Sequence, residues 1–201
     1  MNRSIPLLIG VLFTVVASFV GLVLIPDWQF MPLEPVELDD GRVMPVEPEG
    51  TVAQGRQVYS ELGCIYCHTQ QVRPANFGTD QQRGWGNRQT EPVDHIYDSP
   101  PLLGTMRSGP DLANIGARQP SRTWHHLHLF NPVITSPGSN MPPHRFLYKP
   151  RPRDGERPDR ALDFPDEFDD PDHWWVPSER AEALVDYLLS LDHTYPTGRG
   201  Q

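Results

Sequence analysis

The run Cys64-Ile65-Tyr66-Cys67-His68 decides how this chain is interpreted, because two cysteines separated by two residues and followed by a histidine form the attachment motif of a c-type haem. At this spacing each thiol can form a thioether with a vinyl group of the haem. The adjoining imidazole can then reach the iron as an axial ligand. The motif predicts one covalent haem c, with Cys64 and Cys67 as attachment points and His68 on the iron, and therefore electron transfer.

Other sites that use cysteine fit the sequence less well. The chain contains two cysteines, so a zinc site of four cysteines cannot form within it. A thioredoxin-like redox pair requires a βαβ setting, which the Gly- and Pro-rich flanks do not offer. A site of two cysteines and two histidines stays open because eight histidines are present, although His125 and His128 are too close for the usual spacing.

The amino-terminal stretch 5–25 contains no charged residue. As a helix, its roughly 21 residues reach about 31 Å, enough to cross the hydrocarbon core of a bilayer. This is longer than the apolar region of a signal peptide, and residues 17–19 make a poor cleavage site, which favours an uncleaved anchor. Arg3 precedes the stretch and acidic residues follow it, so the positive-inside rule predicts a single-pass protein of the bacterial inner membrane with its carboxyl-terminal domain in the periplasm.

The remaining chain has the size of one domain. With 23 prolines, 16 glycines and 37% hydrophobic residues, the chain has little material for an extended regular core, and a covalent haem would supply an apolar centre. The net charge of −9 argues against nucleic acid as a partner. Acidic residues gather at 34–49 and 166–172, where they could steer a basic redox partner.

Periodicity indicates a mainly α-helical domain with long loops and no convincing strand. Three helices are expected, at about residues 51–62, 121–130 and 178–189, and Thr51 and Ser178 are the candidate N-caps of the first and the last.

The predicted domain organisation follows from these elements. The Pro-rich acidic stretch 148–177, called the excursion below, is expected to lack secondary structure. The predicted parts are a transmembrane anchor at 1–29, a linker at 30–50, a domain at 51–195 with the excursion at 148–177, and a tail at 196–201.

A helix before the haem motif and another at the carboxyl end, with loops between them, resemble the class I cytochrome c fold. In that family the two terminal helices cross, with a glycine at the close contact and an aromatic residue nearby. Gly55, Tyr59 and Tyr187 resemble these residues. The resemblance implies an N-terminal transmembrane helix followed by a class I cytochrome c-like domain.

Two further segments concern the iron. Gly109-Pro110 resembles the family segment in which a proline carbonyl accepts a hydrogen bond from the proximal histidine, which implies that Pro110 orients His68.

Met141 offers a thioether in a proline-stiffened loop, and a soft sulfur opposite histidine raises the potential of cytochromes c. A sixth ligand from the protein leaves no open site for a substrate. His144 is the first rival of Met141, and the other rivals are Met106, His125, His126 and His128.

The chain also resembles something more specific, the membrane-anchored mono-haem subunit (subunit II) of cbb3-type cytochrome c oxidases. The resemblance covers the anchor through about Leu147, and again the last helix. It rests on the order and spacing of short segments, at residues 64–70, 72–74, 96–100, 107–112, 124–125, 128–132 and 141–142. The chain departs from the family at residues 83–88, at Met106 and in the excursion.

The resemblance implies that one haem c, ligated by His68 and Met141, receives electrons from a dihaem cytochrome c subunit. It would pass them to the b haem of the catalytic haem-copper subunit, so the chain itself would be a non-catalytic part of an oxidoreductase. The implied partners are these two subunits and membrane lipid. The small cytochrome c subunit of a nitric oxide reductase is the alternative, and a catalytic or gas-sensing haem protein is a third interpretation.

Two arginines, Arg73 and Arg107, could balance the haem propionates, because a guanidinium group matches a carboxylate in bidentate geometry. Both lie in segments that resemble the family. Solvated surface arginines are the alternative interpretation, and the sequence alone does not separate the two.

Overall fold

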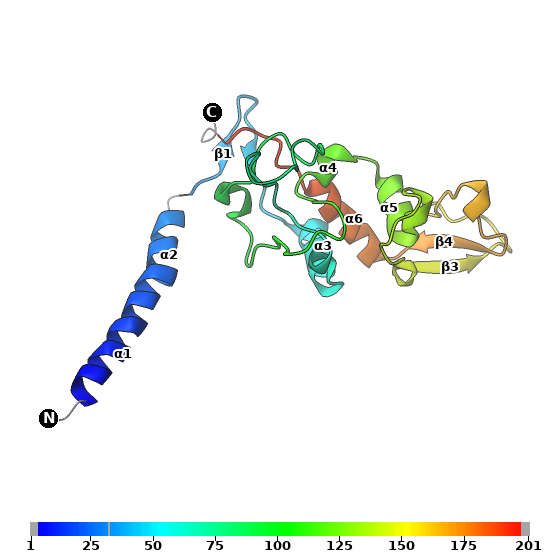
Figure 1. Cartoon of the computed structure of the whole chain (residues 1–201). Coiled ribbons are helices and arrows are strands. Elements are labelled where there is room, and N and C mark those ends of the chain that lie inside the picture. The colour runs from blue at the N-terminus through cyan, green and yellow to red at the C-terminus, as the bar shows by residue number, and fades with distance from the viewer. Residues whose placement is uncertain (1–3, 32, 198–201) are drawn as a thin grey trace.

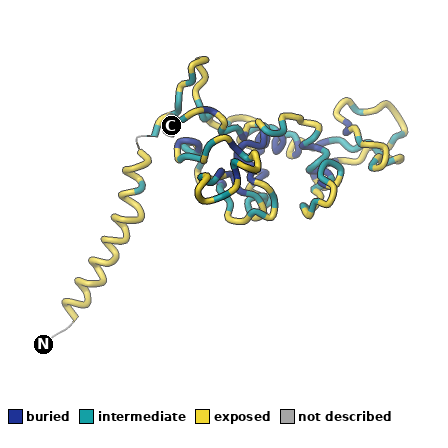
Figure 2. Tube along the Cα trace, turned by 45° about the horizontal axis from the view of Figure 1, so that its top comes forward, coloured by how far each residue is buried: buried dark blue, intermediate teal, exposed yellow. Residues whose placement is uncertain are grey.

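The computed structural model describes residues 4–31 and 33–197. A long amino-terminal helix projects from a folded domain, in which helices lie at the centre and a β-hairpin extends at the far end (Figure 1). Buried residues concentrate in the domain, whereas the amino-terminal helix is exposed along nearly all of its length (Figure 2). Arg3, on which the predicted orientation depends, and residues 198–201 of the predicted tail lie outside the described residues.

The amino-terminal helix comprises α1 (Ser4–Phe19), the π-helical turn η1 (Val20–Leu24) and α2 (Ile25–Phe30). Its 27 residues are long and apolar enough to cross a membrane, and none of its most apolar window is buried. The wider π-helical turn ends two residues before Pro26, which has no N–H to offer a regular helix. The predicted apolar helix is therefore present.

The linker contains a short hairpin that periodicity did not indicate. Strand β1 (Val36–Glu37) pairs antiparallel with β2 (Val43–Met44). Gly41 has a φ of +81° in the turn between them, a conformation that favours glycine. The Arg42 side chain donates to the Asp40 carboxylate at 2.7 Å. Strands of two residues are too short to produce a recognisable alternation in a sequence.

Helices α3 (Gly50–Glu61) and α6 (Glu179–Ser190) pack across each other at the centre of the domain. Gly55 allows their close approach, because a Cβ there would lie 1.8 Å from the Ala183 carbonyl oxygen. Beside it, the rings of Tyr59 and Tyr187 meet edge to face with their centroids 5.4 Å apart. The crossing expected of the class I cytochrome c fold is therefore present.

The helix starts agree with the sequence at two of three places. At α6 the predicted N-cap Ser178 is confirmed, because its hydroxyl accepts a backbone hydrogen bond at 3.3 Å. At α5 (Arg122–Phe130) Ser121, where the helix was expected to begin, is itself the N-cap and accepts a backbone hydrogen bond at 3.2 Å. At α3 the predicted N-cap Thr51 is wrong, because the helix already begins at Gly50 and Glu49 takes the N-cap position without a capping side-chain bond. Packing against α6, rather than a cap, accounts for where α3 forms.

The expectation that residues 148–177 lack secondary structure is wrong. Strand β3 (Tyr148–Pro152) pairs antiparallel with β4 (His173–Pro177), so a hairpin begins and ends the excursion (Figure 1). Trp175 of β4 packs on Phe130 of α5 with ring centroids 5.0 Å apart. The prolines that argued against strands are tolerated because a two-stranded hairpin has outer edges where no N–H is needed.

The remaining elements are short, and they connect these parts around one hydrophobic core that includes Leu184 and Val185 of α6. They are α4 (Ile115–Arg118) and the 3-10 helices η2 (Cys64–Tyr66), η3 (Pro92–His95), η4 (Pro132–Ile134), η5 (Arg145–Leu147) and η6 (Asp166–Phe168).

Replacing Gly55 with alanine is expected to destabilise the domain by about 3 kcal/mol, the upper part of the range for overpacking, since the added methyl meets backbone rather than a flexible side chain. Urea unfolding of the purified protein, followed by circular dichroism, measures the change. Gln54→Ala, at an exposed position of the same helix, is the matched control and should change the free energy of unfolding by less than about 0.5 kcal/mol. Equal stability of Gly55→Ala and the parent protein would contradict a tight crossing.

Candidate functional site

The Cys64–His68 motif begins where α3 ends. Gly63 has a left-handed φ of +71°, and a Cβ there would lie 2.7 Å from the Tyr66 ring, so the turn requires glycine. The 3-10 helix η2 follows, and the His68 N–H donates to the Cys64 carbonyl at 3.0 Å. Both thiols are free, with Cys64 half-buried and Cys67 exposed. Burial raises the pKa of the Cys64 thiol to about 11, so this thiol is protonated at neutral pH.

His68 is oriented through its Nδ1 atom, which lies 2.8 Å from the carbonyl oxygen of Pro110. Because a carbonyl only accepts, Nδ1 carries the proton and Nε2 keeps its lone pair. Burial lowers the pKa of His68, which favours the neutral ring. Gly109 lies against this ring, where a Cβ would stand 2.3 Å from Cε1. The imidazole therefore has the tautomer and the fixed orientation that an iron ligand needs.

Backbone hydrogen bonds join the two segments on both sides of the His68–Pro110 contact. The Gly109 N–H donates to the Cys67 carbonyl at 2.9 Å, and the Leu112 N–H donates to the Thr69 carbonyl at 2.7 Å. These bonds hold the segment that carries Pro110 against the segment that carries His68, so the ring is positioned by backbone as well as by its own hydrogen bond.

Sequence reasoning missed a buried charged cluster next to this contact. Asp111 accepts hydrogen bonds from the Thr69 hydroxyl at 2.6 Å and from the Gln71 N–H at 2.7 Å. Arg107 donates to the Thr69 hydroxyl at 2.8 Å and to Asp80 at 2.5 Å. The one signal in the sequence was an aspartate directly after Gly-Pro, because Thr69 and Gln71, which donate hydrogen bonds to Asp111, lie about 40 residues away along the chain.

The two arginines predicted to face the haem propionates lie in different settings. The Arg107 side chain is 13% exposed and bonds within the cluster. The Arg73 guanidinium carbon lies 5.7 Å from the centroid of the exposed Phe77 ring, and its backbone N–H donates to Asp80 at 2.7 Å. These contacts leave the propionate role of both residues a prediction.

The proposed sixth ligand contacts the core that the motif also contacts, and its first rival lies near His68. Met141 is half-buried and packs against the same apolar core as Cys64 and Ile65. His144 is also half-buried; burial lowers its pKa, and His68 is near enough to lower it further. The fold therefore places Met141 at the core that Cys64 and Ile65 also contact, and His144 stays a rival.

The other rivals have partners or are exposed. Met106 is 59% exposed. The ring nitrogens of His125 and His128 lie 2.9 Å from the Gln119 carbonyl and 2.6 Å from the Thr135 hydroxyl. Nδ1 of His126 lies 3.3 Å from the Tyr148 hydroxyl.

Within residues 4–31 and 33–197, no group of three or more His, Cys, Asp or Glu side chains is placed to hold a metal ion, so the zinc interpretation gains no support.

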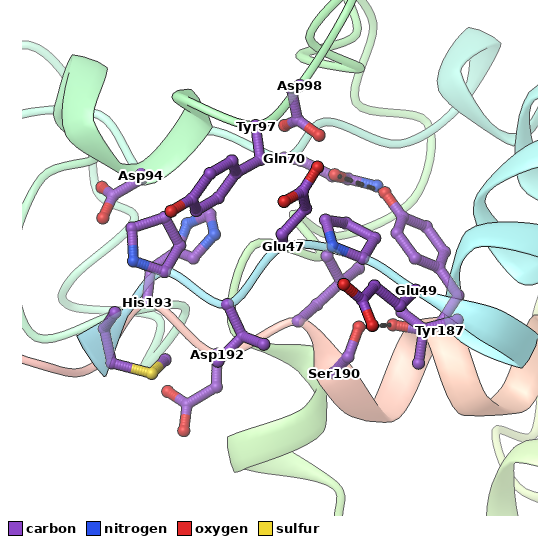
Figure 3. A pocket seen from close by; sticks show the side chains of 16 residues that line it. Glu47, Glu49, Gln70, Asp94, Tyr97, Asp98, Tyr187, Ser190, Asp192 and His193 are labelled. Atoms are coloured by element: carbon purple, nitrogen blue, oxygen red, sulfur yellow. Dashed lines mark hydrogen bonds between the residues drawn. The ribbon is translucent and has the colours of Figure 1, made fainter. Parts of the chain in front are cut away.

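A hollow of about 630 Å³ lies between linker residues 44–49 and the domain (Figure 3). Gln70 and Tyr187 contribute to its wall, where the Tyr187 hydroxyl donates to Gln70 Oε1 at 3.0 Å. Glu47 and Glu49 line it from the linker. The residues that line it include neither the two cysteines nor the predicted axial ligands, so this hollow is separate from the motif.

Two thiols beside an oriented histidine, at the end of a helix that crosses the carboxyl-terminal one, are typical of a cytochrome c. The particular family is given by comparison with known proteins. The family model for the mono-haem subunit of cytochrome c oxidase, FixO, matches residues 2–162, which is most of the chain. The chain belongs to this family, as its resemblance to subunit II of cbb3-type oxidases predicted.

The family settles the broad function. It implies a subunit with one haem in an oxidase complex, and it favours the oxidase over the nitric oxide reductase alternative. The comparison with curated proteins finds no match. Because the family match ends at residue 162, inside the excursion, strand β4 and helix α6 are placed by the structure alone.

Proposed function

We propose that this protein carries electrons within a cbb3-type oxidase through one haem c, bound covalently by Cys64 and Cys67 and ligated by His68 and Met141. The observation that carries the proposal is the His68 imidazole, held by Pro110 so that Nε2 is free to bind iron, next to two free thiols. The haem supplies a reversible one-electron change at its iron. Electrons come from a dihaem cytochrome c subunit and pass to the catalytic haem-copper subunit.

The residues of the chain bind, orient and shield this group. Pro110 holds the proton on Nδ1 of His68, which prevents the ring from turning and leaves Nε2 as the metal-binding atom. The apolar core against which Cys64 and Met141 pack limits water on that side. With Met141 as the sixth ligand, no position is open to a substrate, so the subunit transfers electrons and performs no chemistry on a bound molecule.

We place the helix from Ser4 to Phe30 across the inner membrane, in contact with lipid, and the domain in the periplasm. Its length, its apolar composition and its exposed side chains support a membrane span. Covalent attachment of haem in bacteria belongs to the periplasm. A protease added to intact spheroplasts should therefore remove a carboxyl-terminal tag, whereas a protected tag would reverse the proposed orientation.

Purification from gently solubilised native membranes, through a tag at the carboxyl end, tests the electron-transfer proposal. Mass spectrometry is expected to identify a polytopic haem-copper subunit and a dihaem cytochrome c in the purified complex. A catalytic subunit of the nitric oxide reductase type would replace the proposed electron acceptor. Recovery of the protein alone, with its haem but without partners, would contradict the proposal.

A further inference from the structure

Arg107 joins two buried carboxylates. Its side chain is 13% exposed, and the side chains of Asp80 and Asp111 are 4% and 0% exposed. Nη1 donates to Asp80 at 2.5 Å, and Nη2 lies 3.5 Å from Oδ2 of Asp111. Nη2 also donates to the Gln71 carbonyl. The guanidinium group is thus the cation that reaches both carboxylates, and its removal would leave two buried negative charges without it.

This charged cluster is built into the two segments that carry the His68–Pro110 contact. Thr69 follows His68 in the chain, and its hydroxyl donates to Asp111 at 2.6 Å while it accepts from Nε of Arg107 at 2.8 Å. Asp111 in turn follows Pro110, whose carbonyl accepts from Nδ1 of His68. A displacement of Asp111 would therefore displace the carbonyl that orients the histidine.

The cluster also acts through its charges. Asp111 directly follows Pro110, whose carbonyl lies 2.8 Å from Nδ1 of His68, so the negative field of its carboxylate acts close to the imidazole. Arg107 offsets that negative field, and Arg118, which donates to the backbone carbonyl of Asp111, also interacts with its charge. Oxidation adds a positive charge at the iron, so a cation that offsets carboxylates near its ligand disfavours the oxidised state.

We propose that Arg107 is a positioning residue that raises the reduction potential of the haem, because it compensates Asp80 and Asp111 beside His68. The inference rests on the proposed function, since it requires a haem iron bound to His68. This role differs from a contact with a haem propionate. The nitrogens of Arg107 already donate to the Thr69 hydroxyl, the Asp80 carboxylate and the Gln71 carbonyl.

Redox titration of the purified holoprotein, followed by the visible absorption of the haem, tests this role. At a fixed ambient potential, Arg107→Gln should shift the ratio of oxidised to reduced protein more than tenfold toward the oxidised form, which is a midpoint lowered by more than about 59 mV for one electron. Arg107→Lys keeps the charge and should recover at least half of the shift. The matched control is Arg83→Gln, because Arg83 faces the same Trp85 ring as Arg107 but bonds to Thr79 outside the cluster. It should shift the ratio less than twofold.

The proposal is overturned if Arg107→Gln stays within twofold of the parent protein, or if the glutamine and lysine variants shift equally. Should Arg107→Gln fail to accumulate, Asp80→Asn decides, because loss of a negative charge must move the potential upward whereas general loosening of the fold would not; no rise overturns the proposal. The absorption spectrum of the parent protein separates a failure of the proposed function from a failure of the proposed role of Arg107. A parent protein without thioether-bound haem defeats the proposed function, whereas normal haem c with unshifted variants defeats only the role of Arg107.

Discussion

Replacement of both Cys64 and Cys67 by alanine is expected to abolish covalently bound haem completely. The two thiols are the only ones in the chain, and η2 presents them within one turn directly after Gly63. Without thioethers, His68 and the sixth ligand would hold the haem by coordination alone, and denaturation would release it. Electrophoresis in denaturing detergent, followed by staining for haem peroxidase activity, measures the retained haem against the amount of protein.

The single variants and a neighbour within the motif serve as controls. Cys64→Ala and Cys67→Ala each leave one thiol, so each should retain some haem through a single thioether. Tyr66→Phe changes an exposed side chain at a spacer position of the motif, and it should stain like the parent protein. Haem that remains attached to the double variant after denaturation would refute covalent attachment through these cysteines.

Features that depend on neighbouring residues were the ones that the sequence predicted well. The apolar helix, the serine N-cap of α6 and the end of the first domain helix before Gly63 each depend on residues within a few positions of one another. The crossing of α3 and α6 is a long-range feature, but Gly55, Tyr59 and Tyr187 resembled a known pattern. Resemblance therefore supplied what periodicity alone did not.

The hairpin of β3 and β4 was missed because its stability comes from distant partners. Its strands are short and contain prolines, which normally argue against a strand. What holds β4 is the packing of Trp175 against Phe130 of α5 and the antiparallel pairing with β3. Neither partner is visible in a local window of sequence, so the composition of the excursion gave the wrong prediction.

The charged cluster around Arg107 was missed for the same reason. Asp111 meets Thr69 and Arg107 meets Asp80 across separations of 42 and 27 residues. An arginine in a family-like segment suggested a contact with the haem, because no local pattern reveals buried carboxylates that fold back onto it. A buried arginine must be paired with acceptors within the fold, so burial decides which partners its guanidinium group has.

Met141→Ala is expected to lower the reduction potential of the haem by on the order of 0.2 V, a part of the roughly 0.8 V over which axial ligands set haem potentials. A thioether sulfur favours the reduced iron, and its loss leaves water or a nitrogen ligand that favours the oxidised iron. Met141 packs against the same apolar core as Cys64. Redox titration of the purified protein measures the fall, and the absorption band of sulfur-ligated oxidised haem should disappear with it.

Two control variants identify the ligand. Met106→Ala removes a thioether that is 59% exposed and should leave the potential unchanged. His144→Ala removes the first rival, whose ring lies near enough to His68 to be influenced by it, and should also retain the sulfur band. If His144→Ala alters the spectrum and Met141→Ala does not, the iron has two histidine ligands. Its potential would then be lower than a histidine–methionine pair gives, and the electron donor to this subunit would have to be correspondingly more reducing.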